Sequence, residues 1–206
     1  MLESKYPTSA NQEPMLIVIS GPSGVGKDSV IQLMKLQGLP FYFVVTATSR
    51  LPRSNEIPGA DYIFVTREKF EEMIHNGELL EYARVYEDFK GVPTTQVREA
   101  LASGKDVVMR VDVQGAATIR QLFPDALLIF LVASTEELII RIKQRREDSP
   151  EEAKKRMDVL PEELKHIDEF DFVVVNRDGA LLETANTIQS IILSEHHRSQ
   201  PRKVAL

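Results

Sequence analysis

The sequence has no cysteine among its 206 residues and no long apolar segment. The lack of cysteine excludes disulfide bonds and thiolate metal sites, and it permits a reducing compartment without proving one. No apolar run approaches the roughly 20 residues that a membrane helix needs. We therefore expect a cytoplasmic protein with no membrane partner.

An excess of positive charge is also missing, because the formal net charge is −6. A negative protein is repelled by the phosphate backbone of nucleic acids, so we expect no nucleic-acid partner. The phosphate groups of any ligand must then be met by a few concentrated basic residues.

The first 14 residues are polar, contain two prolines and lack the apolar region of a secretory signal. We expect residues 1–14 to be a disordered lead-in and residues 197–206 to be a polar tail. The whole chain is 43% hydrophobic and 27% charged, which is ordinary for a globular protein. Its length predicts one domain, or one core that carries small inserted subdomains.

Five short apolar runs predict β-strands, and helical patterns lie between them. The runs are Leu16–Ile19, Phe43–Thr46, Val107–Val111, Leu127–Val132 and Phe172–Val175. The helical patterns are Val30–Gln37, Thr95–Ser103, Gly115–Leu122, Glu136–Arg146 and Ala180–Glu195. Most runs are continuous and not alternating, which is typical of parallel strands buried on both faces. The alternation predicts an α/β fold with ligands at the carboxyl ends of the strands.

Two segments interrupt this alternation. Residues 46–95 contain a strand signal at Asp61–Val65 and a short helix at Glu68–His75, and they are too long for one crossover. We interpret them as an inserted subdomain. A second, arginine-rich excursion covers residues 136–160, and we expect Pro161 to break or kink the helix at its end.

The segment GPSGVGKDS, residues 21–29, follows the first strand and precedes the first helix. Gly21, Gly26 and Lys27 fit the phosphate-binding pattern G-x-x-x-x-G-K. Glycines allow several N–H groups to point at one phosphate chain, the helix adds its positive N-terminal end, and Lys27 supplies a full charge. This loop therefore predicts a site for the phosphate chain of a nucleotide.

One position departs from that pattern, because Asp28 and then Ser29 follow the lysine where a Ser or Thr ligand of Mg²⁺ is usual. The Asp28 carboxylate could hold the ion directly or through water. Alternatively Ser29 takes part, or Asp28 only caps the start of the helix. The sequence leaves these three alternatives open.

Six blocks of the sequence, taken together, resemble the guanylate kinases. They are GPSGVGKDS, TATSRLPRSNEIPGADYIFV, ELLEYARVY, VMRVDVQGA, RIKQRRED and FDFVVVN. The resemblance covers about Met15 to Asn176, and its most specific part is R-x-P-R followed by G-x-D-Y-x-F-V. The stretches GPSGVGKD, VVTATSR and FKGVP are most similar to the cyanobacterial and plastid branch of the family.

The resemblance implies an enzyme that transfers the γ-phosphoryl group of ATP to GMP, with Mg²⁺, in purine nucleotide metabolism and GMP recycling. Its substrates are then ATP and GMP, with dGMP as a further acceptor, and the protein is a monomer or small homo-oligomer. The implied P-loop fold has three layers around a five-stranded parallel sheet, within a domain of residues 15–196. The core of this domain covers residues 15–45, 96–134 and 161–196. The mixed-sheet GMP-binding subdomain covers residues 46–95, and the helical lid covers residues 135–160.

The family motifs also imply site residues in this sequence. The ATP-binding residues are Gly21, Pro22, Ser23, Gly24, Val25, Gly26, Lys27, Asp28 and Asn176. The GMP-binding residues are Thr46, Arg50, Arg53, Tyr62, Glu81, Lys90 and Asp112. The catalytic residues are Lys27, Arg141, Arg145 and Arg156, and the carboxylates for Mg²⁺, directly or through water, are Asp28 and Asp112.

The chemistry of these residues suits the implied reaction. A phosphate oxygen is already largely ionised near neutral pH, because its second pKa is about 6, so no side-chain base is required. Arg50 and Arg53 carry guanidinium forks that grip phosphate at two points. Glu81 can accept hydrogen bonds from N1–H and the amino group of guanine, whereas N1 of adenine is an acceptor and repels it. Asp112, at a strand end, suits the metal or the GMP side and can equally cap the next helix.

The sequence departs from the family pattern near the guanine pocket. Lys90-Gly91-Val92 stands where Tyr-Gly-Ser/Thr is usual, so an aromatic ring and a hydroxyl that help hold the base are absent. Thr46 replaces a more frequent serine, and Arg110 stands where many relatives carry an acid. We expect Lys90 to reach guanine O6 or the phosphate, and specificity to depend more on Glu81.

Two other functions compete with this one. The altered pocket could accept another phosphorylated acceptor, such as dGMP or a ribose phosphate. The chain could also resemble the inactive guanylate-kinase-like domains that bind peptides in scaffold proteins. Those domains lose P-loop residues and belong to long chains, whereas Lys27, Arg50, Arg53 and Glu81 are present here.

Overall fold

The computed structural model describes residues 13–54, 56–85, 87–144 and 149–204. Most of the expected lead-in, and the predicted catalytic residue Arg145, lie outside the described residues. Within the described part, no helix is both long enough and apolar enough to cross a membrane.

A five-stranded parallel sheet forms the core, as the sequence predicted. Its strand order is β2-β7-β1-β8-β9. The strands are β1 (Leu16–Ser20), β2 (Tyr42–Phe43), β7 (Val107–Arg110), β8 (Leu127–Val132) and β9 (Phe172–Val175). The pairing of β1 with both β7 and β8 places it at the centre of the sheet. The phosphate-binding loop therefore starts from the middle of the sheet's carboxyl edge.

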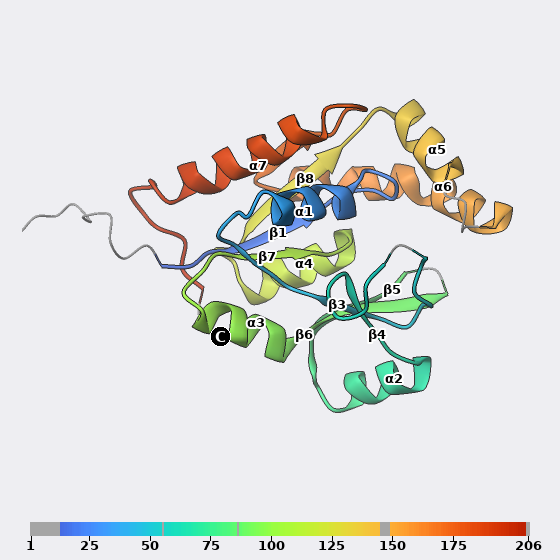
Figure 1. Cartoon of the computed structure of the whole chain (residues 1–206), viewed down its shortest axis with the longest axis horizontal. Coiled ribbons are helices and arrows are strands. Elements are labelled where there is room, and N and C mark those ends of the chain that lie inside the picture. The colour runs from blue at the N-terminus through green and yellow to red at the C-terminus, as the bar shows by residue number, and fades with distance from the viewer. Residues whose placement is uncertain (1–12, 55, 86, 145–148, 205–206) are drawn as a thin grey trace, which may run out of the picture.

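Both faces of this sheet are buried, which explains why its strands are apolar throughout. In β1, Ile17 and Ile19 pack on one face, and Leu16 and Val18 pack on the other. Helices α1 (Lys27–Leu36) and α7 (Leu181–Glu195) cover the first face, and α3 (Thr94–Ala102) and α4 (Val113–Leu122) cover the second. Figure 1 shows these helices above and below the sheet. The result is the expected three-layer α/β architecture.

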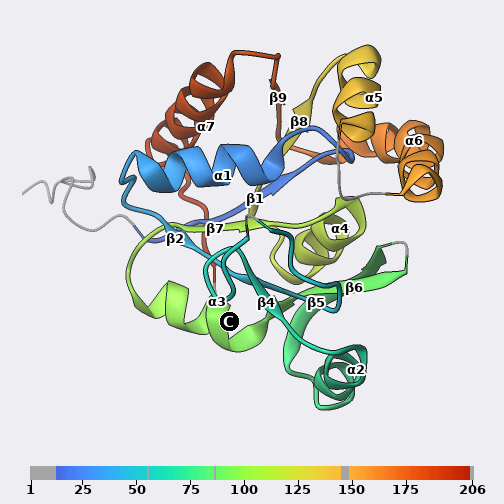
Figure 2. The same cartoon turned by 45° about the vertical axis from the view of Figure 1, so that its right-hand side comes forward.

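A second, four-stranded mixed sheet lies beside the core, in the region where an inserted subdomain was expected. Its strand order is β4-β3-β6-β5, and only β3 and β4 run parallel. Its strands are β3 (Thr46–Thr48), β4 (Tyr62–Phe64), β5 (Leu79–Val85) and β6 (Asp88–Pro93), and α2 (Arg67–His75) packs against them. Figure 2 shows β4, β5 and β6 below the core strands β1 and β7, with α2 lower still.

The second sheet corrects one predicted strand. The apolar run Phe43–Thr46 was expected to be a single strand of the core sheet. The structure divides it, since β2 ends at Phe43 in the core sheet and β3 begins at Thr46 in the second sheet. An apolar run shows that a segment is buried, but it does not show which sheet supplies the partners for its hydrogen bonds.

The arginine-rich segment forms two helices, α5 (Thr135–Lys143) and α6 (Pro150–Lys165). Ser134 and Glu137 form a capping box at the start of α5. Of the two predicted effects of Pro161, the break is wrong, because α6 continues through this residue to Lys165, and the kink stays a prediction. Proline removes one backbone N–H from the helix, and the bonds on either side hold the chain helical. A 3₁₀ turn (His166–Glu169) then leads to β9.

The polar tail returns to the core. The Arg202 side chain donates to the Glu195 carboxylate at 2.6 Å and to the backbone carbonyls of Asp125 and Ala126. Val204 packs against the apolar cluster on the α3–α4 face of the sheet. The polar residues of the tail therefore include one that forms an ion pair with the folded domain.

We predict that Phe70→Ala loosens the second sheet more than the core. Phe70 is fully buried between α2 and the sheet, and its ring stacks on Phe89 with centroids 5.3 Å apart. Removing a ring from such a small core costs about 3–5 kcal/mol. Hydrogen exchange should therefore accelerate in residues 46–93 before it accelerates in β1 and β8.

Leu122→Ala is the matched control, because Leu122 is 51% exposed. This change should alter the free energy of unfolding by less than about 0.5 kcal/mol. Equal acceleration of exchange in both sheets of Phe70→Ala would show that they unfold as one unit.

Candidate functional site

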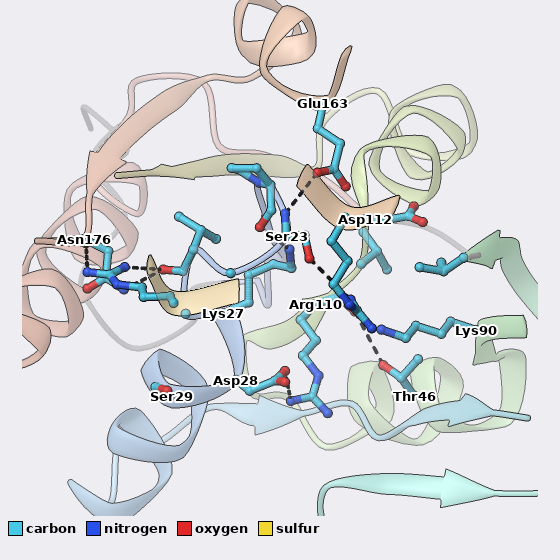
Figure 3. Close-up of a pocket in the computed structure, with 18 of the residues that line it drawn as sticks. Ser23, Lys27, Asp28, Ser29, Thr46, Lys90, Arg110, Asp112, Glu163 and Asn176 are labelled. Carbon is cyan, nitrogen blue, oxygen red and sulfur yellow. Dashed lines mark hydrogen bonds and ion pairs between the residues drawn. The ribbon is translucent and has the colours of Figure 1, made fainter. Parts of the chain in front are cut away.

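A cavity of about 450 Å³ lies where the carboxyl ends of the core strands face the second sheet. Its predicted lining residues are Pro22, Ser23, Gly24, Val25, Gly26, Lys27, Asp28, Thr46, Arg53, Tyr62, Glu81, Lys90, Asp112, Arg141, Arg156 and Asn176. Figure 3 shows side chains from the core, the second sheet and the arginine-rich helices meeting there. Residues spread over most of the chain thus form a single site.

The phosphate-binding loop has the curled backbone that the glycine pattern predicted. Gly26 precedes α1 with φ of 95°, and a β-carbon there would lie 2.6 Å from the Asn176 side chain. Only glycine fits both conditions. The Asn176 amide donates to the Val25 carbonyl at 2.7 Å and accepts from Thr184 at 3.0 Å. Asn176 therefore anchors the loop while also lining the cavity.

The Lys27 ammonium group folds back over this loop, where it donates to the carbonyls of Gly21 and Pro22. Desolvation lowers the pKa of Lys27 to about 8, although Glu163 nearby favours the charged form. The lysine therefore lacks a full counter-charge, which a phosphate group could supply.

Glu163 occupies the mouth of the same loop, and sequence reasoning missed it. Its carboxylate accepts a hydrogen bond from the Ser23 backbone N–H at 3.0 Å, as Figure 3 shows. The Arg156 guanidinium donates to the Ser23 hydroxyl at 3.3 Å. Burial raises the pKa of Glu163. Glu163 and Arg156 both belong to α6, so this helix contacts the loop directly. No signal in the sequence indicated Glu163, because a single glutamate in a charged helix is usually only a surface residue.

Arg50 and Arg53 lie together as predicted, but a carboxylate that the prediction did not include holds them. Arg50 donates to Glu56 at 2.7 Å, and Arg53 lies 3.5 Å from the same carboxylate. Arg53 lines the cavity, whereas Arg50 lies behind it with its guanidinium 4.7 Å from the centre of the Tyr62 ring. Glu56 follows the R-x-P-R motif by three residues, and that spacing was the available signal.

The interpretation of Asp28 as a simple helix cap is wrong. Gly26 is the cap residue of α1, and Asp28 lies within the first turn. Its carboxylate accepts from the Arg110 guanidinium at 2.6 Å and from the Tyr62 hydroxyl at 3.5 Å. Sequence reasoning noted Arg110 only as a departure from the family pattern, and the structure places it in the cavity lining.

Lys90 extends from β6 into the cavity, and its ammonium group lies 5.8 Å from the centre of the Tyr62 ring. Desolvation lowers its pKa to about 8. Lys90 is therefore on the Tyr62 side of the cavity, and Glu81 is a separate lining residue on β5.

Glu81 is 4% exposed and packs against the first turn of α4. A β-carbon on Gly115 would lie 2.6 Å from its carboxylate, so only glycine leaves room for it there. Asp112 caps α4 by accepting from the Gly115 N–H at 2.8 Å, as one of the sequence alternatives held. Burial, and then the Asp112 charge, raise the pKa of Glu81 to about 8. A donor that pairs with the Glu81 carboxylate would relieve this cost.

The remaining predicted residues lie around these groups. Thr46, at the start of β3, donates to the Arg110 carbonyl at 3.4 Å. Arg141 on α5 donates to the Asn176 carbonyl at 3.0 Å and so approaches the phosphate-binding loop. The cavity also includes Gln144, Arg177 and Asp178, which sequence reasoning did not select.

The carboxylates of the cavity could hold a divalent ion only together with substrate phosphates and water. Within the described residues, no group of three or more His, Asp or Glu side chains is arranged to hold a metal. Mg²⁺ normally binds one or two carboxylates together with substrate phosphates and waters. Asp28 and Asp112 both line the cavity and fit that arrangement.

Comparison with known proteins gives one consistent result. The sequence matches the guanylate kinase family profile over residues 13–195. It is 45% identical over 203 residues to guanylate kinase 2, chloroplastic/mitochondrial, of Oryza sativa subsp. japonica, covering 98% of this chain and 71% of that protein. It is 38% identical to the guanylate kinase of Clostridioides difficile, covering 89% of each chain. The fold matches the crystal structure of guanylate kinase from Anaplasma phagocytophilum with a TM-score of 0.74 and 27% identity, covering 92% of this chain and 89% of that one.

The raised pKa of Glu81 predicts a pH-dependent gain of stability in Glu81→Gln. The unfolded chain releases this proton near pH 4.5 and the folded protein near 8, so the folded state binds more protons between these values. The wild-type free energy of unfolding therefore falls as pH rises through this window, by at most about 1.4 kcal/mol per pH unit. The glutamine side chain of the variant is always neutral, so the melting temperature of the variant should increasingly exceed that of the wild type.

Thermal melts at about pH 5.5 and about pH 7.5 measure this difference. Glu78→Gln, an exposed change on the same chain segment, is the control and should show no such trend. A difference in melting temperature that is the same at both pH values would contradict the prediction.

Proposed function

The chain belongs to the guanylate kinase family, enzymes that transfer the γ-phosphoryl group of ATP to GMP, and we propose how its residues divide this reaction. The phosphate-binding loop, with Lys27, binds ATP. The second sheet and the loop before β4 bind GMP. The observation that carries this proposal is the single cavity in which both sets of phosphate-binding groups face each other.

GMP is held at two ends in this proposal. Arg53 and Tyr62 bind its phosphate, with Lys90 on the same side of the cavity, and Arg50 would join them by exchanging the Glu56 carboxylate for the phosphate. Glu81 binds guanine N1–H and the amino group, while Thr46 and Asp112 complete the base pocket. The buried position of Glu81 supports this role, because an adenine base would present an acceptor at N1 and no amino group at C2.

Phosphoryl transfer then depends on alignment and on charge. The attacking GMP oxygen is already ionised, so the protein has to hold two anions in line and exclude water. Lys27, Arg141 and Arg156 approach the phosphate-binding loop and are the cations that would balance the moving charge. Arg145, in the segment between α5 and α6, belongs to the same proposal from the sequence alone.

Mg²⁺ is the cofactor that the family implies. Asp112 is the carboxylate that would hold it, directly or through water, with ATP phosphates as further ligands, and Asp28 is a second candidate only where it is released from Arg110. When bound, the ion neutralises charge on the phosphate oxygens.

The domain roles follow the same division. We propose that residues 46–95 are the GMP-binding subdomain and that residues 135–160 are a lid over ATP, around the core. A monomer or a small homo-oligomer is proposed as the active species. A cytoplasmic location and use of dGMP are further proposals, and the similarity to the rice enzyme supports membership of the plastid-type branch.

A coupled assay with several acceptors tests the function. We expect the protein to use GMP and dGMP with ATP and Mg²⁺, and to use AMP and UMP at least about 10³-fold less well, since both present unsuitable groups to Glu81. Glu81→Gln should lower kcat/KM for GMP by about 10²-fold or more, because two charge-assisted hydrogen bonds are lost. Glu78→Gln is the control and should retain wild-type selectivity. Preference for a ribose phosphate, or no activity at all, would exclude a guanylate kinase.

Lys90→Tyr tests whether Lys90 contacts GMP. This change restores the residue that the family pattern favours but removes a positive charge from the Tyr62 side of the cavity. We expect the KM for GMP to rise by about tenfold while the KM for ATP stays constant. Lys69→Tyr, an exposed change on α2, is the control. An unaltered KM for GMP would remove Lys90 from the site.

A further inference from the structure

Three residues at which the sequence departs from the family pattern lie around one aromatic ring. Lys90 and Arg110 both place their cationic groups over Tyr62, at 5.8 and 4.1 Å from its ring centre. Asp28 accepts hydrogen bonds from both Arg110 and the Tyr62 hydroxyl. These positions are far apart in the sequence, and the fold brings them to one point.

Arg110 connects three segments of the chain through one guanidinium group. One nitrogen donates to Asp28 in the first turn of α1 at 2.6 Å, and the other donates to the backbone carbonyl of Asp61 just before β4. Its guanidinium carbon lies over the ring of Tyr62, the first residue of β4. The arginine itself ends β7 of the core sheet. Arg110 therefore links the phosphate-binding loop to the second sheet.

The position of Arg110 also suits a ligand contact. Its side chain is only 10% exposed, yet it lines the cavity beside Lys90 and Arg53. A guanidinium carries five N–H donors, and the two contacts above leave others for a ligand. Arg50 approaches Tyr62 as well, with its guanidinium 4.7 Å from the ring centre. Several cations thus surround the ring, with Asp28 as the carboxylate that pairs with Arg110.

We propose that Arg110 binds the phosphate of the acceptor nucleotide and that Asp28 is the positioning residue that holds Arg110 in place. Asp28 then takes the position of the usual magnesium-binding hydroxyl without taking its role. This inference rests on the proposed function, because it assigns residues to the acceptor phosphate of that reaction.

The two possible roles of Asp28 predict different kinetics. If Asp28 positions Arg110, losing its charge should weaken acceptor binding and should matter only while Arg110 is present. If Asp28 serves the metal, losing its charge should shift the Mg²⁺ concentration for half-maximal rate, whether or not Arg110 is present. A double-mutant cycle separates these cases.

The cycle uses Asp28→Asn, Arg110→Gln and the double variant, each assayed with varied GMP, ATP and Mg²⁺. We expect Arg110→Gln to raise the KM for GMP by at least about tenfold and Asp28→Asn to raise it severalfold. The double variant should resemble Arg110→Gln alone, and the Mg²⁺ concentration for half-maximal rate should stay within about twofold of wild type in all three. Effects of the two changes that multiply, or an equal Mg²⁺ shift with and without Arg110, would overturn the proposal.

Two further variants control for folding and for general loss of an ion pair. Arg120→Gln breaks the ion pair of Arg120 with Asp171, in which the two groups lie 2.8 Å apart. Neither residue lines the cavity, so this change should leave the KM for GMP unchanged. Arg110→Lys keeps the charge without the fork, and it replaces Arg110→Gln in the cycle if that variant melts below the assay temperature. Its KM should lie above the wild-type value, and a wild-type KM in both Arg110→Lys and Asp28→Asn would overturn the proposal. Failure of the wild-type protein to phosphorylate GMP would instead disprove the proposed function.

Discussion

Several positively charged side chains are buried around one cavity, and the rest of the structure depends on keeping them stable there. Three groups of these cations have a carboxylate from the protein nearby. Glu56 lies with Arg50 and Arg53, Asp28 with Arg110, and Glu163 at the mouth of the phosphate-binding loop near Lys27. Without such partners, burial of these cations would cost several kcal/mol each.

These carboxylates contact groups that could also bind the phosphates of a nucleotide. Glu163 accepts from a backbone N–H of the loop, and Glu56 receives two guanidinium groups. We expect substrate phosphates to replace part of these interactions, so that binding exchanges one set of anions for another. Because Glu163 belongs to α6, ATP binding and the position of that helix should be linked.

The second sheet contributes part of the cavity lining because it packs on the core. Glu81 comes from β5, but the space for its carboxylate is provided by Gly115 on α4. Arg110 comes from β7, but its contacts are on α1 and before β4. The site therefore exists only when the core and the second sheet are together, although its residues come from separate layers.

The sequence by itself determined the parallel core sheet, the phosphate-binding loop and most of the cavity residues. Continuous apolar runs show burial on both faces, and the glycines and Lys27 form a local pattern whose backbone geometry needs no distant partner. Only the tertiary structure divided the run Phe43–Thr46 between two sheets, carried α6 through Pro161 and paired Asp28 with Arg110. Those outcomes depend on which segments meet across the fold, and contacts between distant residues leave no periodicity or spacing in the chain to read.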